Sequence, residues 1–86
     1  CDRMGLIVWQ DMPSGEENAR WPLDGTELAD DRPGAAIFER ELTAMIRARR
    51  HHPCIVAWVP FNEAWGQFRT SHWTDVVKRL DPTRLV

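Results

Sequence analysis

Residues 54–63 read CIVAWVPFNE, six apolar residues followed abruptly by proline, phenylalanine, asparagine and glutamate. A continuous apolar run of this length, bounded by prolines, is typical of a buried strand. We therefore predict a strand over residues 54–59. A polar pair, Asn62 and Glu63, then lies just beyond the carboxyl end of that strand.

An earlier apolar run, residues 6–9 (LIVW), is closed by the polar Gln10 and Asp11. Because the run does not alternate, it favours a strand covered on both faces, and we predict a strand over residues 6–11. Periodicity then disappears over residues 12–33, where prolines, glycines and acids accumulate. A loop of about 20 residues is unusual in a compact domain. It is either a binding loop or a plain surface excursion, and the sequence leaves both open.

A first amphipathic helix is predicted after this loop. Asp30 or Asp31 can cap it, and Pro33 is tolerated in its first turn. Pro53 ends it, after a basic last turn that suits the negative end of the helix dipole. Its apolar positions recur with the helical period and are Phe38, Leu42, Met45 and Ile46.

A second amphipathic helix is predicted between residues 70 and 81. Thr70 or Ser71 can cap it, and Asp81-Pro82 ends it. Its apolar stripe consists of Trp73, Val76, Val77 and Leu80. Residues 84–86 then begin another strand. Strands that alternate with helices in this way are typical of an α/β fold with a parallel sheet.

Length and composition exclude several classes of protein. A chain of 86 residues holds one core at most, so an architecture of about 250 residues can be present only as a piece. The net charge of -2, without a long basic run, argues against a nucleic-acid partner. No stretch of about 18 apolar residues exists to span a membrane. Two cysteines make neither a disulfide framework nor a metal site, so no metal or other cofactor is predicted.

Two polar groups follow the predicted strands, and in parallel α/β folds ligands gather at such strand ends. They are Gln10-Asp11 after the first strand and Asn62-Glu63 after the second. An acid at the rim of an apolar core is favoured in its neutral form, as a general acid requires. Asn62 offers a donor and an acceptor to hydroxyl groups. The alternative is that Glu63 caps the following segment or pairs with an arginine.

Five tryptophans in so short a chain also call for an explanation, because each buries a large ring and brings an N–H that needs an acceptor. Trp58 lies within a strand and Trp73 on a helix stripe, so both are predicted to be core residues. Trp9 either lines a pocket floor or packs under a helix. Trp65 and Trp21 are the candidates for a surface that stacks on a ligand.

Four blocks of the chain, in order, resemble the catalytic barrel of glycoside hydrolase family 2. They are residues 1–11 (CDRMGLIVWQD), 50–58 (RHHPCIVAW), 61–63 (FNE) and 80–86 (LDPTRLV). That family includes β-galactosidases, β-glucuronidases and β-mannosidases. The resemblance implies that residues 1–86 are a fragment of a (β/α)8 TIM barrel, namely about the third and fourth strands with their helices and the start of the fifth.

The resemblance also implies a chemistry. Family members hydrolyse terminal β-linked sugars with retention of configuration. Glu63 falls on the general acid/base of the family, and Asn62 falls on the residue that hydrogen-bonds the 2-hydroxyl of the sugar. The expected partners are a carbohydrate substrate, the remainder of the barrel and flanking β-sandwich domains.

Two departures from the family pattern limit this reading. The nucleophile of the family is a glutamate on the seventh strand, which lies outside this chain, so the fragment alone is expected to be inactive. Asp11, the acid at the neighbouring strand end, is not assigned as the nucleophile. It is predicted to bind a sugar hydroxyl or a basic neighbour, with a purely structural hydrogen bond as the alternative. In the β-galactosidase branch a Glu and a His after the third strand bind magnesium. Here residues 12–15 read MPSG, so no metal site is predicted.

The sequence also allows two rival hypotheses. The chain could be a non-catalytic carbohydrate-binding or interaction module with barrel topology. It could also be a complete small βα domain unrelated to sugars.

Overall fold

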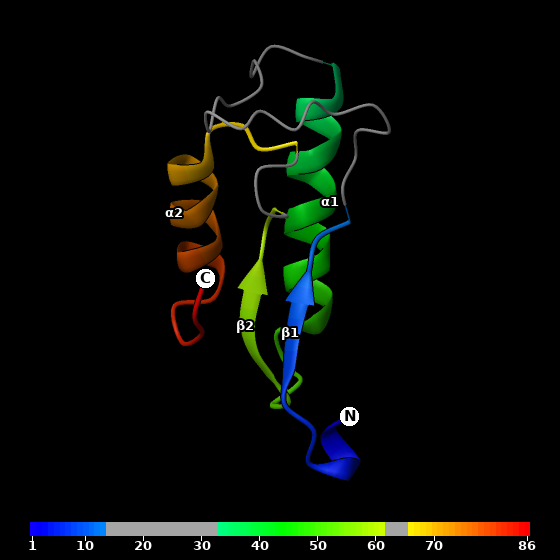
Figure 1. The fold of residues 1–86 in the computed structure, drawn as a ribbon. Coiled ribbons are helices and arrows are strands. Elements are labelled where there is room, and N and C mark those ends of the chain that lie inside the picture. Colours follow the sequence, from blue (N-terminus) through cyan, green and yellow to red (C-terminus); the bar gives the residue numbers. More distant parts are fainter. Residues whose placement is uncertain (14–32, 62–65) are drawn as a thin grey trace.

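The computed structural model describes residues 1–13, 33–61 and 66–86 (Figure 1). The elements in chain order are a 3-10 turn η1 (Asp2–Met4), β1 (Val8–Asp11), α1 (Pro33–Arg49), β2 (Ile55–Val59) and α2 (Thr70–Leu80). Figure 1 shows β1 and β2 side by side, with α1 against one face of the pair and α2 beyond β2. The predicted α/β alternation is confirmed, and the chain forms a small α/β piece rather than a closed barrel.

The two strands are parallel, as the alternation predicts. Trp9 pairs with Ala57 and Asp11 with Val59, after one register shift near the start of β1. The backbone N–H of Met12 donates to the main-chain oxygen of Val59 at 2.9 Å, which carries the pairing past the end of β1. Both strands therefore end at the same edge.

Where a third strand is predicted to begin, the structure has a single isolated bridge. Leu85 forms a parallel bridge with Ala57. Its N–H donates to the main-chain oxygen of Val56 at 3.2 Å, and its carbonyl accepts from the N–H of Trp58 at 2.9 Å. β2 consequently has a hydrogen-bonded neighbour on each side.

The first strand differs from its prediction in length and in cover. Leu6 and Ile7 precede the strand and are exposed, so the pairing begins only at Val8. The expectation of a strand covered on both faces was wrong for this chain, because Trp9 is 72% exposed and Asp11 is also exposed. The physical reason is that α1 and α2 pack against only one face of the sheet (Figure 1).

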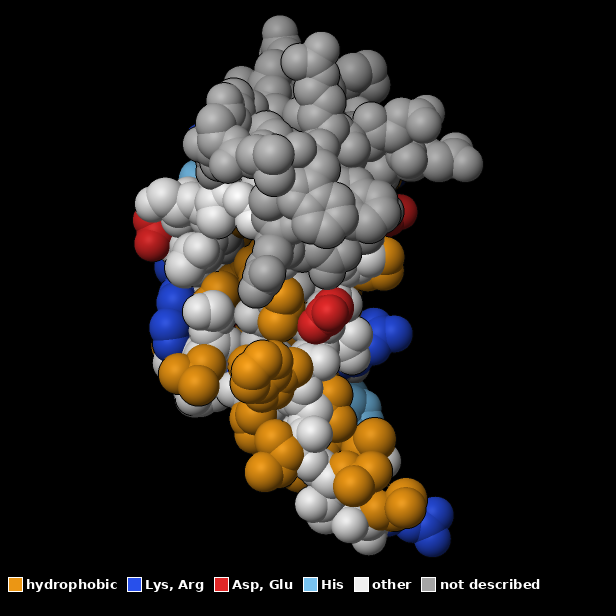
Figure 2. Space-filling model, viewed as in Figure 1, with side chains coloured by type: hydrophobic (Ala, Val, Ile, Leu, Met, Phe, Trp, Pro, Cys, Tyr) orange, Lys and Arg blue, Asp and Glu red, His pale blue; other side chains and the backbone are white. Residues whose placement is uncertain are grey.

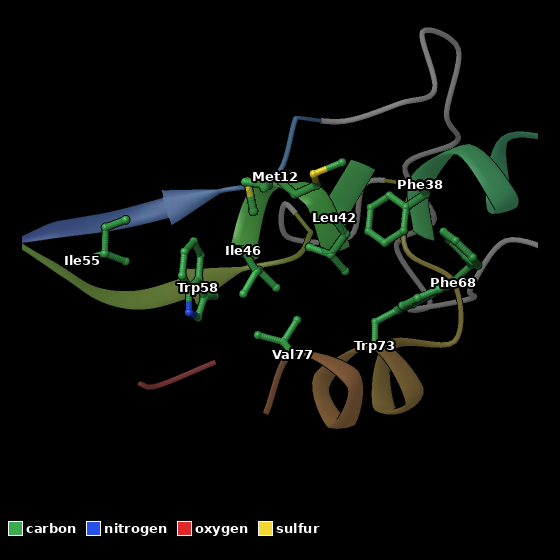
Figure 3. Close-up of a cluster of buried hydrophobic side chains, with 10 residues drawn as sticks. Met12, Phe38, Leu42, Ile46, Ile55, Trp58, Phe68, Trp73 and Val77 are labelled. Carbon is green, nitrogen blue, oxygen red and sulfur yellow. The ribbon is translucent and has the colours of Figure 1, made fainter. Parts of the chain in front are cut away.

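The hydrophobic core lies between the sheet and the two helices. It is made of Met12, Phe38, Leu42, Met45, Ile46, Ile55, Trp58, Phe68, Trp73 and Val77. Figure 3 shows Leu42 and Ile46 of α1 and Val77 of α2 converging on Trp58 of β2. The predicted stripe of α1 and the core roles of Trp58 and Trp73 are confirmed. Met12 belongs to the core as well, although the sequence assigned it to the long loop.

The beginning of α2 corrects a second expectation. Thr70 is the first helical residue rather than its cap, and the capping position is Arg69, with left-handed backbone angles of φ 44 and ψ 43 and no side-chain cap hydrogen bond. The carbonyl of Thr70 accepts instead from Thr74 Oγ1 at 3.0 Å. The proposed caps of α1, Asp30 and Asp31, lie outside the described residues.

The end of α2 is anchored by a buried carboxylate. Asp81 is 4% exposed and accepts hydrogen bonds from Trp58 Nε1 at 2.9 Å, from Thr83 Oγ1 at 2.6 Å and from Arg84 Nη1 at 2.6 Å. Burial by itself would raise the pKa of Asp81. The hydrogen bonds from Thr83, Trp58 and Arg84 outweigh that effect and hold its pKa well below the usual value. The guanidinium of Arg84 also donates to the carbonyls of Ile55 and His52.

Candidate functional site

The carboxyl edge of the sheet is where the sequence predicts chemistry, and the register decides which side chains share its faces. Trp58 packs against the helices, so its strand neighbours Ala57 and Val59 face the opposite side. Trp9 and Asp11 pair with these two residues and therefore share their face. The structure thus brings Trp9 and Asp11 together on the sheet face that neither helix covers.

This open face is apolar apart from its carboxyl end. In Figure 2, which looks onto it, hydrophobic side chains gather in the middle of the molecule and continue toward the N-terminal turn. Among the described residues, the large exposed hydrophobic side chains include Trp9 on this face, Leu6 and Ile7 directly before β1, and Leu85, which is bridged to β2. Of the two alternatives for Trp9, packing under a helix is excluded for α1 and α2, because the indole lies on the other side of the sheet.

Asp11 stands at the carboxyl end of this face with its side chain exposed. Within the ranges that the structure describes, no group donates a hydrogen bond to its carboxylate. Gln10 Nε2 donates instead to the main-chain oxygen of Asp11, at 3.1 Å. The structural hydrogen bond that was the alternative role of Asp11 is therefore not formed among these residues.

Beyond β2 the chain enters a cluster of aromatic rings. Phe61 stacks on Phe38 of α1, with ring centroids 4.9 Å apart and planes 4° apart. Phe68, which precedes α2, meets both rings edge to face, at 5.2 Å from Phe38 and 5.6 Å from Phe61. Trp73 closes the cluster against Phe38 and Phe68. This cluster was not predicted from the sequence, apart from the helical spacing of Phe38 and Trp73.

Three of the predicted site residues, Asn62, Glu63 and Trp65, lie outside the described residues, and so does Trp21. Their roles stay predictions. The described residues that border them are Phe61 on one side and Gly66 on the other. The described residues at this edge of the sheet are therefore Trp9, Asp11 and the aromatic cluster.

The amino end of the sheet has a different character. His52 Nδ1 lies 2.6 Å from Asp2 Oδ2, and the N–H of Cys54 donates to Asp2 Oδ1 at 2.9 Å. Hydrogen bonds from the Cys54 side chain and from His52 hold the pKa of Asp2 well below its usual value, and Asp2 in turn raises the pKa of the Cys54 thiol. These residues border an open hollow of about 410 Å³. It extends from the starts of both strands along β1 as far as Gln10.

Across the described segments, no helix has both the length and the apolar character that a membrane span needs. Among the same residues, no three side chains of the His, Cys, Asp and Glu types come together as a metal site would require.

The sequence of the chain matches a known protein family. The sequence model of the TIM barrel domain of the glycosyl hydrolases family 2 matches residues 1–86. The chain belongs to glycosyl hydrolase family 2. The resemblance of the four sequence blocks is thereby confirmed. In a TIM barrel the helices form the outer ring, which fits the position of α1 and α2 on one face of the sheet.

Several relatives in this family are beta-galactosidases. The chain is 35% identical to that of Klebsiella pneumoniae over 89 residues and 35% identical to that of Yersinia enterocolitica over 86 residues. It is 34% identical to that of Yersinia pestis bv. Antiqua over 86 residues. Each comparison covers 100% of this chain and 8% of the relative, so the chain spans a small part of the family 2 proteins that it matches.

Proposed function

We propose that this chain is part of a retaining glycoside hydrolase that cleaves terminal β-linked sugars, and that Glu63 is its general acid/base. The main support is the membership of residues 1–86 in family 2, through its barrel domain. The chain supplies about the third and fourth strands of that barrel, with the start of the fifth. The nucleophile belongs to a later strand outside residues 1–86, so this piece alone is inactive.

The described edge supports the placement of the chemistry. Asp11 and Val59 are paired at the ends of β1 and β2, and Glu63 follows Val59 by four residues. The active sites of TIM barrels lie at the carboxyl ends of the strands, inside the ring of helices. The exposed face that carries Trp9 and Asp11 is the face that would line the interior of the barrel.

In this proposal each side chain has a separate role in binding or catalysis. Glu63 donates its proton to the glycosidic oxygen while the external nucleophile attacks the anomeric carbon, so the C–O bond breaks and the alcohol leaves. The Glu63 carboxylate then takes a proton from water, whose oxygen attacks the glycosyl-enzyme and releases the nucleophile. Asn62 hydrogen-bonds the sugar 2-hydroxyl. Asp11 binds another hydroxyl, and Trp9 and Trp65 offer apolar surface to the ring.

The test is Glu63→Gln in the full-length protein. Aryl β-galactosides are the first substrates to use, because the relatives are named beta-galactosidases; aryl β-glucuronides and β-mannosides follow. Loss of a general acid typically costs about 10²- to 10⁴-fold. We expect a loss of this size for glycosides with poor leaving groups such as phenol. The glycosylation step with dinitrophenol, which departs without protonation, should change far less.

Glu39→Gln is the matched control, because Glu39 is an exposed acid on α1. It should leave both substrates unaffected. Equal losses for good and poor leaving groups in the Glu63→Gln glycosylation step would contradict the acid role. A full-length protein that binds these glycosides and cleaves none would support the alternative of a non-catalytic carbohydrate-binding module.

A further inference from the structure

The side of α1 that faces away from α2 carries exposed apolar residues at helical spacing. Figure 3 shows Ile46 of α1 converging with Val77 of α2. Ile37 comes nine residues before Ile46, which is about two and a half helical turns, so it points to the opposite side of α1. Ala44 and Ala48 follow on the same side as Ile37, and Ile37 is 46% exposed. This apolar side of α1 is suited to contact another helix.

The hollow of about 410 Å³ lies between the end of α1, the turn η1 and the starts of the two strands. Val8 and Gln10 line it on the helix-bearing face of β1, because Trp9 between them points to the open face. Arg49, the last residue of α1, and Arg3 bring two guanidinium groups to its wall. Among the described residues, β1 is paired with β2 alone and is the edge strand next to this hollow.

The charges around the hollow favour a group that accepts hydrogen bonds. Asp2 borders it as well, but this carboxylate already accepts from the N–H of Cys54 and contacts His52. The guanidinium groups of Arg3 and Arg49 are therefore the groups that an occupant of the hollow would meet. Guanidinium groups donate hydrogen bonds and accept none.

A neighbouring contact shows which acceptor an arginine at this end of the sheet binds. Arg50 Nη1 donates to the main-chain oxygen of Leu80, the last residue of α2, at 3.1 Å. The last carbonyls of a helix have no partner within the helix and form the negative end of its dipole. Arg50 thus caps the helix on one side of α1. Arg49 lies about 100° around the helical path from Arg50 and lines the hollow instead.

The family of the chain indicates what lies on the other side of α1. In a TIM barrel the helices form a ring, so each helix has a neighbour on either side. One neighbour of α1 is α2, and the second is the helix that leads into β1. Both α1 and α2 end at the amino end of the sheet, where the next strand begins. A helix that leads into β1 with the same handedness also ends there.

We propose that the hollow and the Ile37 side of α1 receive the helix that leads into β1 in the full-length protein, and that Arg49 donates hydrogen bonds to the last carbonyls of that helix. The occupant is an amphipathic helix of the same protein. Its apolar stripe packs against Ile37 and Val8, and its carboxyl end meets Arg49. Arg49 positions this helix and takes no part in the reaction, so the proposal is independent of the role of Glu63.

The test is hydrogen exchange in the full-length protein, measured by mass spectrometry on the peptides directly before residue 1. We expect Arg49→Gln to speed exchange in the last turn of the preceding helix by about 5- to 30-fold, because hydrogen bonds from a charged donor are lost. Arg49→Lys keeps the charge without the forked donor and should give a smaller increase. Arg47→Gln is the matched control, because Arg47 is also a cation of the last turn of α1 but borders a different hollow. It should leave this exchange unchanged.

Ile37→Ala tests the apolar side of α1 independently. Alanine has the higher helix propensity, so this substitution would stabilise α1 if Ile37 faced water in the full-length protein. If the preceding helix covers Ile37, exchange in that helix should become at least about 10-fold faster, because a buried side chain is truncated.

Three results would overturn the proposal. Unchanged exchange in Arg49→Gln, or an equal increase in Arg47→Gln, would remove the capping role of Arg49. Unchanged or slower exchange in Ile37→Ala would show that no helix docks on this side of α1. An effect of Ile37→Ala that depends on protein concentration would assign this surface to a second copy of the protein instead.

Discussion

The two ends of the sheet treat their carboxylates in opposite ways. At the amino end, Asp2 accepts from the Cys54 N–H and lies in contact with His52. Asp81, whose partner Arg84 reaches the start of β2, is likewise fully engaged. Both carboxyl groups have lowered pKa values and are fixed as anions. At the carboxyl end, Asp11 has no such donor among the described residues, and the local packing is aromatic. The partners of Asp2 and Asp81 serve stability, whereas the role proposed for Asp11 requires a carboxylate without such partners.

The comparison is tested most severely by Asp81→Asn. The substitution keeps the shape of the side chain but leaves the largely buried guanidinium of Arg84 without its counter-charge. Breaking a buried ion pair costs about 3–5 kcal/mol, and we expect about 3 kcal/mol here because Arg84 keeps two carbonyl acceptors. The measurement is hydrogen exchange of the amides of Trp58 and Leu85 in the full-length protein. Both amides bond across the bridge beside Asp81.

Asp75→Asn is the control for this variant, since Asp75 is an exposed acid on the same helix and should change the stability by less than about 0.5 kcal/mol. The leaving-group dependence of the Asp81→Asn enzyme should match that of the wild type. Selective loss of activity on poor leaving groups, with exchange unchanged, would show that the amino end belongs to the chemistry rather than to stability.

Sequence periodicity was enough for the elements of the fold but not for this polar network. The stripe from Phe38 to Ile46 and the all-apolar run of β2 report burial directly, because each follows the geometry of one element. Asp81 looked only like the end of a helix. Its burial depends on Trp58, which lies 23 residues earlier in the chain. The exposure of Trp9 was equally hidden, because it depends on what packs against the second face of the sheet.

For the candidate site as well, the sequence predicted the position along the chain but not the packing around it. The positions of Asp11 and Glu63 after two apolar runs indicate the carboxyl edge, because parallel strands end together. The ring contact between Phe61 and Phe68 could not be inferred, since neither residue belongs to a periodic pattern. What a motif predicts is the type of the reacting group. The packing at this edge of the sheet is distributed over residues far apart in the chain.

A substitution at the carboxyl end of the sheet should have a smaller effect, and it should lower the activity rather than the stability. In the full-length protein, Asp11→Asn keeps an acceptor oxygen but removes the charge. We expect a loss of about 5- to 10-fold in kcat/KM, because a hydrogen bond to a charged group is worth roughly 1 kcal/mol more than a neutral one. The loss should be the same for phenyl and dinitrophenyl glycosides, and the stability should be unchanged, since Asp11 is exposed.

Glu41→Gln, at an exposed position on α1, is the control for general charge effects and should leave kcat/KM unaltered. Two results would count against the assignment of Asp11. A lowered stability of the Asp11→Asn protein would point to a structural partner. A loss confined to poor leaving groups would give Asp11 a part in proton transfer.

The smallest effect on stability is expected from Asp2→Asn. The informative result is whether this effect grows or shrinks as the pH falls. The pKa of Asp2 is lowered in the folded protein, so its contribution to stability is present above the unfolded value of about 4 and is lost as the pH falls toward the folded value. The contact with His52 is largely exposed, and exposed pairs contribute little. Hydrogen exchange near Cys54 should therefore be slightly faster in Asp2→Asn than in the wild type at pH 7. The difference should shrink below about pH 4. A difference that grew on acidification would mean that Asp2 is protonated in the native state, and the contrast between the two ends of the sheet would then lose one of its two fixed anions.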